Sequence, residues 1–160
     1  MINMERYNEI LRHETFCSLL ERLNILEEKR KFCGHDLRHL LDVARIAYIM
    51  SLEQKKDIEK DLIYAAGLLH DLGRVEEYES GKEHHIESAR IAGNIMKDCG
   101  YLQEEIETVK EAIMGHRKDD NTNELAVLLY QADKLSRNCF CCKAYEECKW
   151  DEDRKNKGVV

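Results

Sequence analysis

Residues 65–73 read AAGLLHDLG, an apolar run that leads directly into a histidine and an aspartate. The run closes a helix that we expect over about residues 57–73, and its apolar character aims that helix end at the protein interior. Burying an imidazole and a carboxylate costs several kcal/mol unless a partner satisfies them. A divalent cation would satisfy both groups, whereas a hydrogen-bonded pair is the alternative for His70 and Asp71 taken alone.

Two other polar residues end apolar helical faces. His39 lies on a helix expected over residues 36–51, and Asp133 closes the apolar run ELAVLLYQAD. Adjacent positions of one helix do not face each other, so further partners for His70 and Asp71 must come from other helices. Three helices that each present a polar site at the end of an apolar stripe indicate a shared cation.

The composition favours an all-α protein. The chain has 160 residues, 43% of them apolar, with no proline and only 8 glycines, whereas β-rich folds use both residues in their many turns. This length is typical of one domain, so we expect a single domain over residues 1–160, with a motif-bearing core at about 34–137. Apolar periodicity predicts a bundle of about six or seven helices. We expect them at 4–31, 36–51, 57–73, 85–98, 103–116, 124–137 and, as a short last helix, within the cysteine-rich segment 138–150.

The boundaries of these helices carry recognisable signals. Asp36 and Asn123 are expected N-caps, and Gly100 is expected to stop the helix before it. The polar stretches 74–83 and 117–123 are predicted to be loops that rim a pocket, and the charged tail 151–160 is predicted to fray.

Charge and cysteine content restrict the expected binding partners and cellular compartment. The net charge of -7 disfavours binding to a nucleic-acid duplex. No apolar run approaches the ~20 residues needed to span a bilayer, so no membrane partner is expected. Seven cysteines, an odd number in a chain without an export signal, favour the reducing cytoplasm.

Four of these residues resemble a known pattern. The HD superfamily of metal-dependent phosphohydrolases has the pattern H…HD…D on a helical core, and the resemblance spans most of the chain, from about residue 34 to 137. The matching residues are His39 in HLLDVARIA, His70 and Asp71 in LLHDLG, and Asp133 in QADKLSR. The resemblance implies that these four side chains bind a divalent metal.

Two further elements resemble HD subfamilies with a second metal, such as bacterial diadenosine tetraphosphate hydrolases and some cyclic dinucleotide phosphodiesterases. HHIESARIA is similar to their HPxxGA-type element, which implies His84 as a ligand and His85 as a neighbouring or substrate-binding group. AIMGHRKD is similar to their AIxxHT element and implies His116 as a ligand. Ser88 and Arg117 depart from these patterns, which leaves open that His84 and His116 contact substrate phosphate over a single metal.

The resemblance implies a reaction as well as a site. His and Asp ligands without thiolates suit Fe or Mn, with Co, Ni and Mg as alternatives, and we expect two ions per chain. A metal-activated hydroxide would cleave a phosphoester or phosphoanhydride bond of a nucleotide-like substrate, with Asp71 and His70 as catalytic residues.

Two alternatives remain for this reaction. GHDLRH, which contains His35 and Asp36, resembles an element of HD-type nucleoside triphosphate pyrophosphatases, so a mononuclear pyrophosphatase is the first. A non-catalytic domain that senses a metal or nucleotide is the second.

Basic residues cluster beside the expected ligands, which is what a phosphorylated small-molecule substrate requires. The expected substrate-binding residues are Arg74, Lys82, His85, Arg117, Lys134 and Arg137.

The segment NCFCCKAYEECKW contains one C-x2-C pair, Cys139 and Cys142, a common half of a zinc site. The spacing from Cys142 to Cys148 is not a standard second half. A structural metal on Cys139, Cys142 and Cys148 is therefore one interpretation, and free thiols packed as small apolar groups are the other. We expect Cys17, Cys33 and Cys99 to be core or helix-surface residues.

Overall fold

The computed structural model describes residues 5–116 and 123–159. Within these ranges the secondary structure is helical without any β-strand, so the all-α prediction is confirmed. The elements are α1 (Tyr7–Ile10), α2 (Glu14–Leu26), α3 (Leu37–Glu53), α4 (Lys60–Leu69), α5 (Arg74–Ser80), α6 (His84–Asp98), α7 (Gln103–Gly115), α8 (Glu124–Leu135) and the 3-10 helix η1 (Cys139–Cys141).

The predicted boundaries are accurate where a capping residue marks them. The Asp36 side chain accepts a hydrogen bond from the His39 amide at 3.0 Å and begins α3. Asn123 does the same for α8 through the Ala126 amide at 3.0 Å. Gly100, with a φ of 81°, follows α6, and its left-handed conformation is one that glycine adopts without steric cost.

Three predicted segments are wrong. The first predicted helix is split, because His13 caps a new helix by accepting a hydrogen bond from the Thr15 amide at 3.2 Å. The predicted loop at 74–83 contains α5, a surface helix. Its sequence is polar and Val75 is its buried residue, so no apolar periodicity marks it as a helix. The predicted last helix at 138–150 is only η1 followed by turns.

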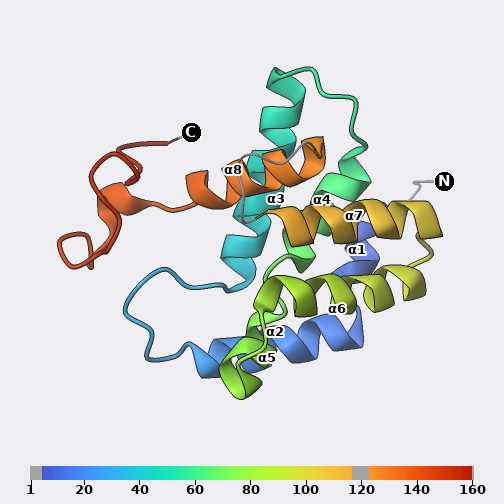
Figure 1. Cartoon of the computed structure of the whole chain (residues 1–160), viewed down its shortest axis with the longest axis horizontal. Coiled ribbons are helices and arrows are strands. Elements are labelled where there is room, and N and C mark those ends of the chain that lie inside the picture. Colours follow the sequence, from blue (N-terminus) through green and yellow to red (C-terminus); the bar gives the residue numbers. More distant parts are fainter. Residues whose placement is uncertain (1–4, 117–122, 160) are drawn as a thin grey trace.

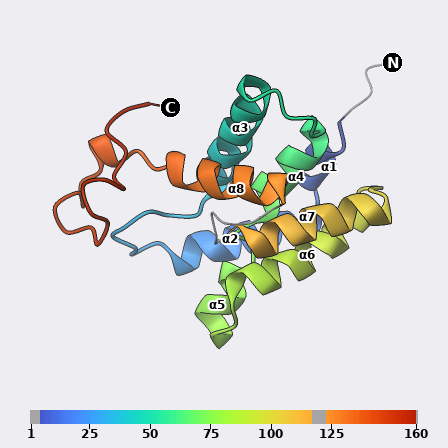
Figure 2. The same cartoon turned by 45° about the horizontal axis from the view of Figure 1, so that its top comes forward.

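The helices pack so that their ends meet at one place. Helix α3 packs against α4 and α8, α7 against α8, and α6 against α7 (Figures 1 and 2). The contact between α3 and α4 is unusually close, because a Cβ on Gly67 would lie 2.6 Å from the Cα of Ala44. This packing buries the apolar faces of α3, α4 and α8 in one core and brings the end of α4 beneath α8.

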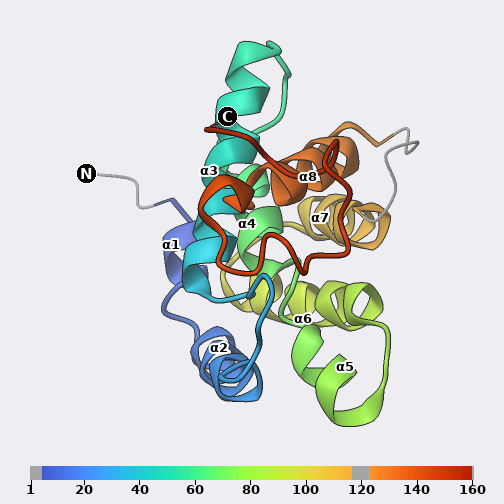
Figure 3. The same ribbon diagram turned by 90° about the vertical axis from the view of Figure 1, so that its left-hand side faces the viewer.

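Residues 138–159, here called the C-terminal segment, fold back onto the end of α8 (Figure 3). The Asn156 amide donates to the carbonyl oxygens of Lys134 and Arg137 at 2.8 and 2.7 Å, so the described part of the tail is fastened rather than frayed as predicted. In the described ranges, none of the helices has the length and apolar character needed to cross a bilayer.

Candidate metal centre

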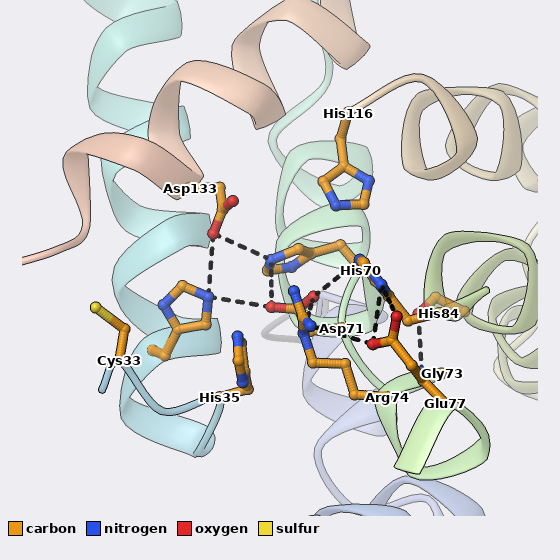
Figure 4. Close-up of polar contacts among 12 residues, drawn as sticks. Cys33, His35, His70, Asp71, Gly73, Arg74, Glu77, His84, His116 and Asp133 are labelled. Carbon is orange, nitrogen blue, oxygen red and sulfur yellow. Dashed lines mark hydrogen bonds and ion pairs between the residues drawn. The ribbon is translucent and has the colours of Figure 1, made fainter. Parts of the chain in front are cut away.

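Six side chains from five parts of the fold converge between the helix ends (Figure 4). All are buried except Asp133, which is partly buried. They are His39 on α3, His70 and Asp71 in the turn after α4, His84 at the start of α6, His116 directly after α7, and Asp133 near the end of α8.

The first group of potential ligands is His39, His70, Asp71 and Asp133. Each offers one ligand atom, and these atoms all lie within 4.8 Å of one another. The Nε2 atom of His39 lies 3.2 Å from oxygens of both Asp71 and Asp133. The Nε2 atom of His70 lies 3.1 Å from Asp71 and 3.7 Å from Asp133. This spacing suits one metal ion held by two imidazoles and two carboxylates.

A second group shares Asp71 with the first. The ligand atoms of Asp71, His84 and His116 also lie within 4.8 Å of one another. The Asp71 Oδ2 atom faces His39 and His70, and its Oδ1 atom lies 3.9 Å from Nε2 of His84. Asp71 is therefore the one residue that the two groups of potential ligands share.

Hydrogen bonds on the far side of each ring fix which nitrogen faces the centre. Nδ1 of His70 and of His116 donates to the carbonyl oxygens of Gly67 and Ile113, at 2.8 Å in the first case, and these oxygens can only accept. Nδ1 of His84 faces a Glu77 carboxylate oxygen at 3.2 Å. These partners leave Nε2 as the metal-facing atom, an arrangement typical of histidine ligands.

His39 is oriented by a serine. The Ser136 hydroxyl donates to the Asp133 carbonyl oxygen at 2.7 Å and lies 3.2 Å from Nδ1 of His39. Because the hydroxyl proton is already committed, its oxygen accepts from Nδ1. The lone pair of His39 Nε2 then faces the two carboxylates.

Charge and hydrogen bonding at the centre suit a bound cation. Nε2 of His70 and Oδ1 of Asp133 are buried atoms without a hydrogen-bond partner among the described residues, which is rare in native proteins. Burial disfavours ionisation of Asp71, but His70 and Arg74 outweigh it and hold the pKa of Asp71 well below its usual value. Two ionised carboxylates beside buried imidazole nitrogens fit a divalent ion.

Burial and the neighbouring charges also shift the pKa values of the histidines at the centre. Burial opposes protonation of His70, but Asp71 and Asp133 raise its pKa to about 10. Burial, reinforced by His70, lowers the pKa of His116 to about 4. The carboxylates thus stabilise positive charge on His70, as a proton that a bound ion would displace, while His116 stays neutral and available as a ligand.

Comparison with known proteins agrees with this arrangement. The family model described as "HD domain" matches residues 36–138. The chain belongs to the HD domain family. A protein of Clostridium beijerinckii, described as an uncharacterized protein, is 44% identical over 153 residues, which cover 96% of this chain and 97% of the relative.

Further relatives of this HD domain are longer or more distant. Ribonuclease Y of Pelobacter propionicus is 30% identical over 125 residues, 78% of this chain but only 22% of the relative. The crystal structure of a predicted HD superfamily hydrolase from an uncultured Thermotogales bacterium superposes with a TM-score of 0.63 at 21% identity, covering 87% of this chain and 80% of that one. This last likeness supports the fold.

The predicted substrate-binding residues of the HD domain divide into two sets. Arg74, Lys134 and Arg137 line a cavity of about 650 Å³ that reaches the centre at Asp133. Lys82 and His85 do not line it, and they form ion pairs with Glu76 and Glu83 at 3.7 and 3.2 Å. Arg117 lies outside the described residues.

Each of the three cavity cations is already engaged near the centre. Arg74 Nε contacts Asp71 at 2.9 Å, and Lys134 Nζ contacts Asp133 at 3.2 Å. Arg137 donates to the Gly34 carbonyl at 2.6 Å, and its second nitrogen lies 3.4 Å from Nε2 of His39. These side chains therefore border both the centre and the cavity.

Sequence reasoning left several supporting residues without a role. Ser136 and Glu77 orient His39 and His84, and neither stands in a recognisable pattern. His35 is buried beside His39 with ring centres 5.7 Å apart. The motif GHDLRH pointed to His35. Its hydrogen-bond partner Glu27, whose carboxylate lies 2.6 Å from Nδ1 of His35, stands eight residues earlier in the chain and could not be recognised from the motif.

Proposed function

We propose that this HD domain is a metal-dependent phosphohydrolase with a dinuclear centre, and that it cleaves a phosphoester or phosphoanhydride bond of a nucleotide-like substrate. The observation that carries the proposal is the position of Asp71. This carboxylate belongs to two groups of converging ligand atoms at once. A mononuclear site requires only the first group.

The chain's own residues prepare the centre for this chemistry. A bound divalent ion lowers the pKa of water and neutralises phosphoryl oxygens. Arg74 holds Asp71 through an ion pair of 2.9 Å and keeps it ionised. Hydrogen bonds that Nδ1 of His70 and His84 donate keep their Nε2 atoms directed inward. Because the fold fixes these side chains before the metal and substrate bind, little of the site has to rearrange during the reaction.

The adjoining cavity suits a nucleotide. Arg74, Lys134 and Arg137 line it together with Asp133 and offer donors for phosphate oxygens. The aromatic rings of Tyr145 and Trp150 line it as well. Aromatic faces stack on nucleobases regardless of base identity. This lining supports a substrate with a phosphate at the metals and a base against an aromatic ring of the C-terminal segment.

The named relatives favour the same class of chemistry. Two of the similar proteins carry the names Ribonuclease Y and predicted HD superfamily hydrolase. This chain spans about a fifth of the length of Ribonuclease Y, so we draw from that name only the cleavage of a phosphorus–oxygen bond, with short RNA as one substrate to be tested.

The decisive experiment pairs metal analysis with a substrate screen. Anaerobically purified protein, with and without added Mn or Fe, is assayed on nucleoside triphosphates, dinucleoside polyphosphates, cyclic dinucleotides and short RNA. We expect chelation to abolish turnover and metal to restore it. Pyrophosphate as product with one His/Asp-bound metal would favour the mononuclear pyrophosphatase. Tight binding without turnover across the panel would favour the sensor.

His116→Ala tests the second metal position directly. We expect this variant to lose one ion per chain compared with the wild type, while His13→Ala, a substitution outside the centre, keeps both. An unchanged metal content in His116→Ala would refute the dinuclear part of the proposal. Zinc held elsewhere is excluded from the count by loading with Mn, which binds thiolate sites weakly.

A further inference from the structure

The C-terminal segment buries little apolar surface compared with the helical core. Between residues 138 and 159 it contains only η1 and turns, and its buried residues are Cys139, Ala144 and Lys155. Asn156 holds it to the end of α8 through hydrogen bonds, and a segment with so little apolar burial is stabilised further by a disulfide or a bound metal. It carries four of the seven cysteines of the chain, and all of the described cysteines are free thiols.

A cysteine from a distant loop joins this segment. Cys33 lies in the loop over residues 27–36 between α2 and α3, rather than in the core or on a helix surface as predicted. It lines the same cavity as Cys139, Cys142 and Cys148. The α2–α3 loop and the C-terminal segment run beside each other in Figure 3, and Lys31 forms an ion pair with Glu147 there.

We propose a structural zinc ion that fastens the C-terminal segment to the α2–α3 loop and so forms one wall of the cavity. Its ligands, here called the thiol cluster, are Cys33, Cys139, Cys142 and Cys148.

The local geometry favours these four over the remaining cysteine of the segment. The Cys142 amide donates to the Cys139 carbonyl at 3.1 Å, a tight turn that spans the C-x2-C spacing of a structural zinc site. Cys139 is buried and Cys142 and Cys148 are partly buried, whereas Cys141 is exposed. Burial raises the pKa of Cys33, Arg137 lowers it, and the thiols of Cys139, Cys142 and Cys148 raise it further.

Basic residues surround the cluster in the way that a four-thiolate zinc site requires. Zinc with four thiolates carries two negative charges, and each thiol that binds releases its proton to solvent. Arg30 and Arg137 line the same cavity, and the Arg30 side chain donates to the Cys33 carbonyl at 2.7 Å. The buried Lys155 lines the same cavity as well.

Binding must draw the sulfur atoms inward. Tetrahedral zinc–sulfur bonds place the sulfurs roughly 3.8 Å apart, and among the described cysteines no three sulfurs lie within 4.8 Å of one another. The cluster is thus loosely assembled, unlike the His/Asp centre. Closing the cluster takes side-chain rotations and movements of the turns, and the described part of the C-terminal segment has no long helix to resist them.

The test uses cobalt as a spectroscopic substitute for zinc in the full-length chain. Apo protein is titrated with Co²⁺ under anaerobic, reducing conditions. We expect a near-ultraviolet thiolate-to-cobalt band whose final intensity corresponds to one thiolate-bound ion per chain and which disappears when zinc is added. A cobalt ion in the His/Asp centre gives no such band, so the result does not depend on the proposed catalytic function. The absence of the band from the wild type would refute the proposal.

Matched cysteine variants assign the ligands. Cys33→Ser and Cys142→Ser should each lose most of the band, whereas Cys141→Ser, two residues from Cys139, should keep it. Full band intensity in Cys33→Ser would show that the α2–α3 loop supplies no zinc ligand. It would refute the proposed link between this loop and the C-terminal segment.

A measurement on the wild type covers the case of misfolded variants. Zinc should slow maleimide labelling of the four cluster thiols at least tenfold while leaving the exposed Cys17 and Cys141 reactive. Equal labelling with and without zinc would refute the proposal.

Discussion

The His/Asp centre, through Asp133, and the thiol cluster both border the same cavity, but the chain builds them in different ways. The centre stands on helix ends that a common core holds together, and its ligand atoms already lie within 4.8 Å of one another. The thiol cluster stands on a loop and on turns, and its sulfurs are not yet gathered. Helices position ligands before the ion arrives, whereas turns depend on the ion to position them.

This difference has an energetic origin. Nδ1 of His70 and of His84 has a hydrogen-bond partner, so their orientation is fixed by the fold. The charge of Asp71 is buried and balanced by Arg74 and the surrounding imidazoles. The centre should therefore keep its shape when a ligand is replaced by an isostere, and lose only its chemistry.

Asp71→Asn tests this with the largest expected effect. The amide keeps the side-chain volume but removes the charge shared by both ligand groups, so we expect kcat/KM to fall more than about 100-fold, beyond the loss typical of residues that only support a ligand. Metal content should fall in parallel while helix content by circular dichroism is kept. Asp57→Asn, in an exposed loop, is the control. Wild-type metal content in Asp71→Asn would contradict the shared-ligand arrangement.

A substitution at Gly73 should break the helical framework itself. A Cβ at this position would lie 2.2 Å from the His84 carbonyl oxygen and 2.4 Å from the Ser88 amide, so α6 must move away from the turn that carries Asp71. We expect Gly73→Ala to lower the free energy of unfolding by about 3 kcal/mol, measured by urea denaturation, and to weaken metal binding.

Gly93→Ala, within α6, is the matched control. Its added Cβ would meet the flexible Lys110 side chain at 3.4 Å and Ile106 at 3.8 Å, an ordinary van der Waals contact. Removal of a mid-helix glycine should stabilise the protein by about 0.5–1 kcal/mol. Equal destabilisation by the two substitutions would show that the close approach at Gly73 does not position the centre.

Much of the His/Asp centre was predictable because its residues obey helical periodicity. His39 and Asp133 each end an apolar stripe, and a buried polar residue at such a position requires a partner. Caps such as Asp36 are local signals that a single sequence displays directly. The helices α3, α4, α6, α7 and α8 were therefore recognisable close to their observed bounds.

The remaining features depend on contacts between segments distant in sequence. Helix α5 escaped prediction because its buried face is reduced to Val75. The nearness of Cys33 to the C-terminal cysteines is set by how the tail folds back, through contacts such as that between Asn156 and α8. Such contacts leave no periodic pattern in the sequence, and only the fold reveals them.

Ser136→Ala sharpens the comparison by removing an orienting contact but no ligand. Without the hydroxyl, Nδ1 of His39 loses its acceptor, and we expect metal affinity to fall about 10- to 100-fold. Competition with a fluorescent chelator measures this change. Ser80→Ala, on an exposed helix end, should leave the affinity unaltered. An equal loss in both variants would point to a general effect on folding instead of the orientation of His39.

The smallest expected effect concerns the α2–α3 loop, which lies between the two sites. Glu27 accepts hydrogen bonds there from the His35 amide at 2.8 Å, from Nδ1 of the same residue at 2.6 Å and from the Tyr78 hydroxyl at 2.7 Å. Burial opposes ionisation of Glu27, but these bonds, those from His35 foremost, lower its pKa from 4.5 to about 2. Burial also lowers the pKa of His35, so a neutral ring donates to an ionised carboxylate at neutral pH.

The sign of the pH dependence follows from these values. Because the pKa of Glu27 is lower in the folded state, its contribution to stability is fully present above the unfolded value near 4.5 and is lost as the pH falls toward 2. We expect Glu27→Gln to lower the free energy of unfolding by about 1–3 kcal/mol at pH 7, with the difference from the wild type shrinking between pH 5 and pH 2. Urea denaturation across this range measures it, and Glu79→Gln, which breaks the exposed pair with Arg22, should cost less than about 1 kcal/mol. A Glu27→Gln deficit that stays constant with pH would mean that the loop depends on the shape of this side chain and not on its charge.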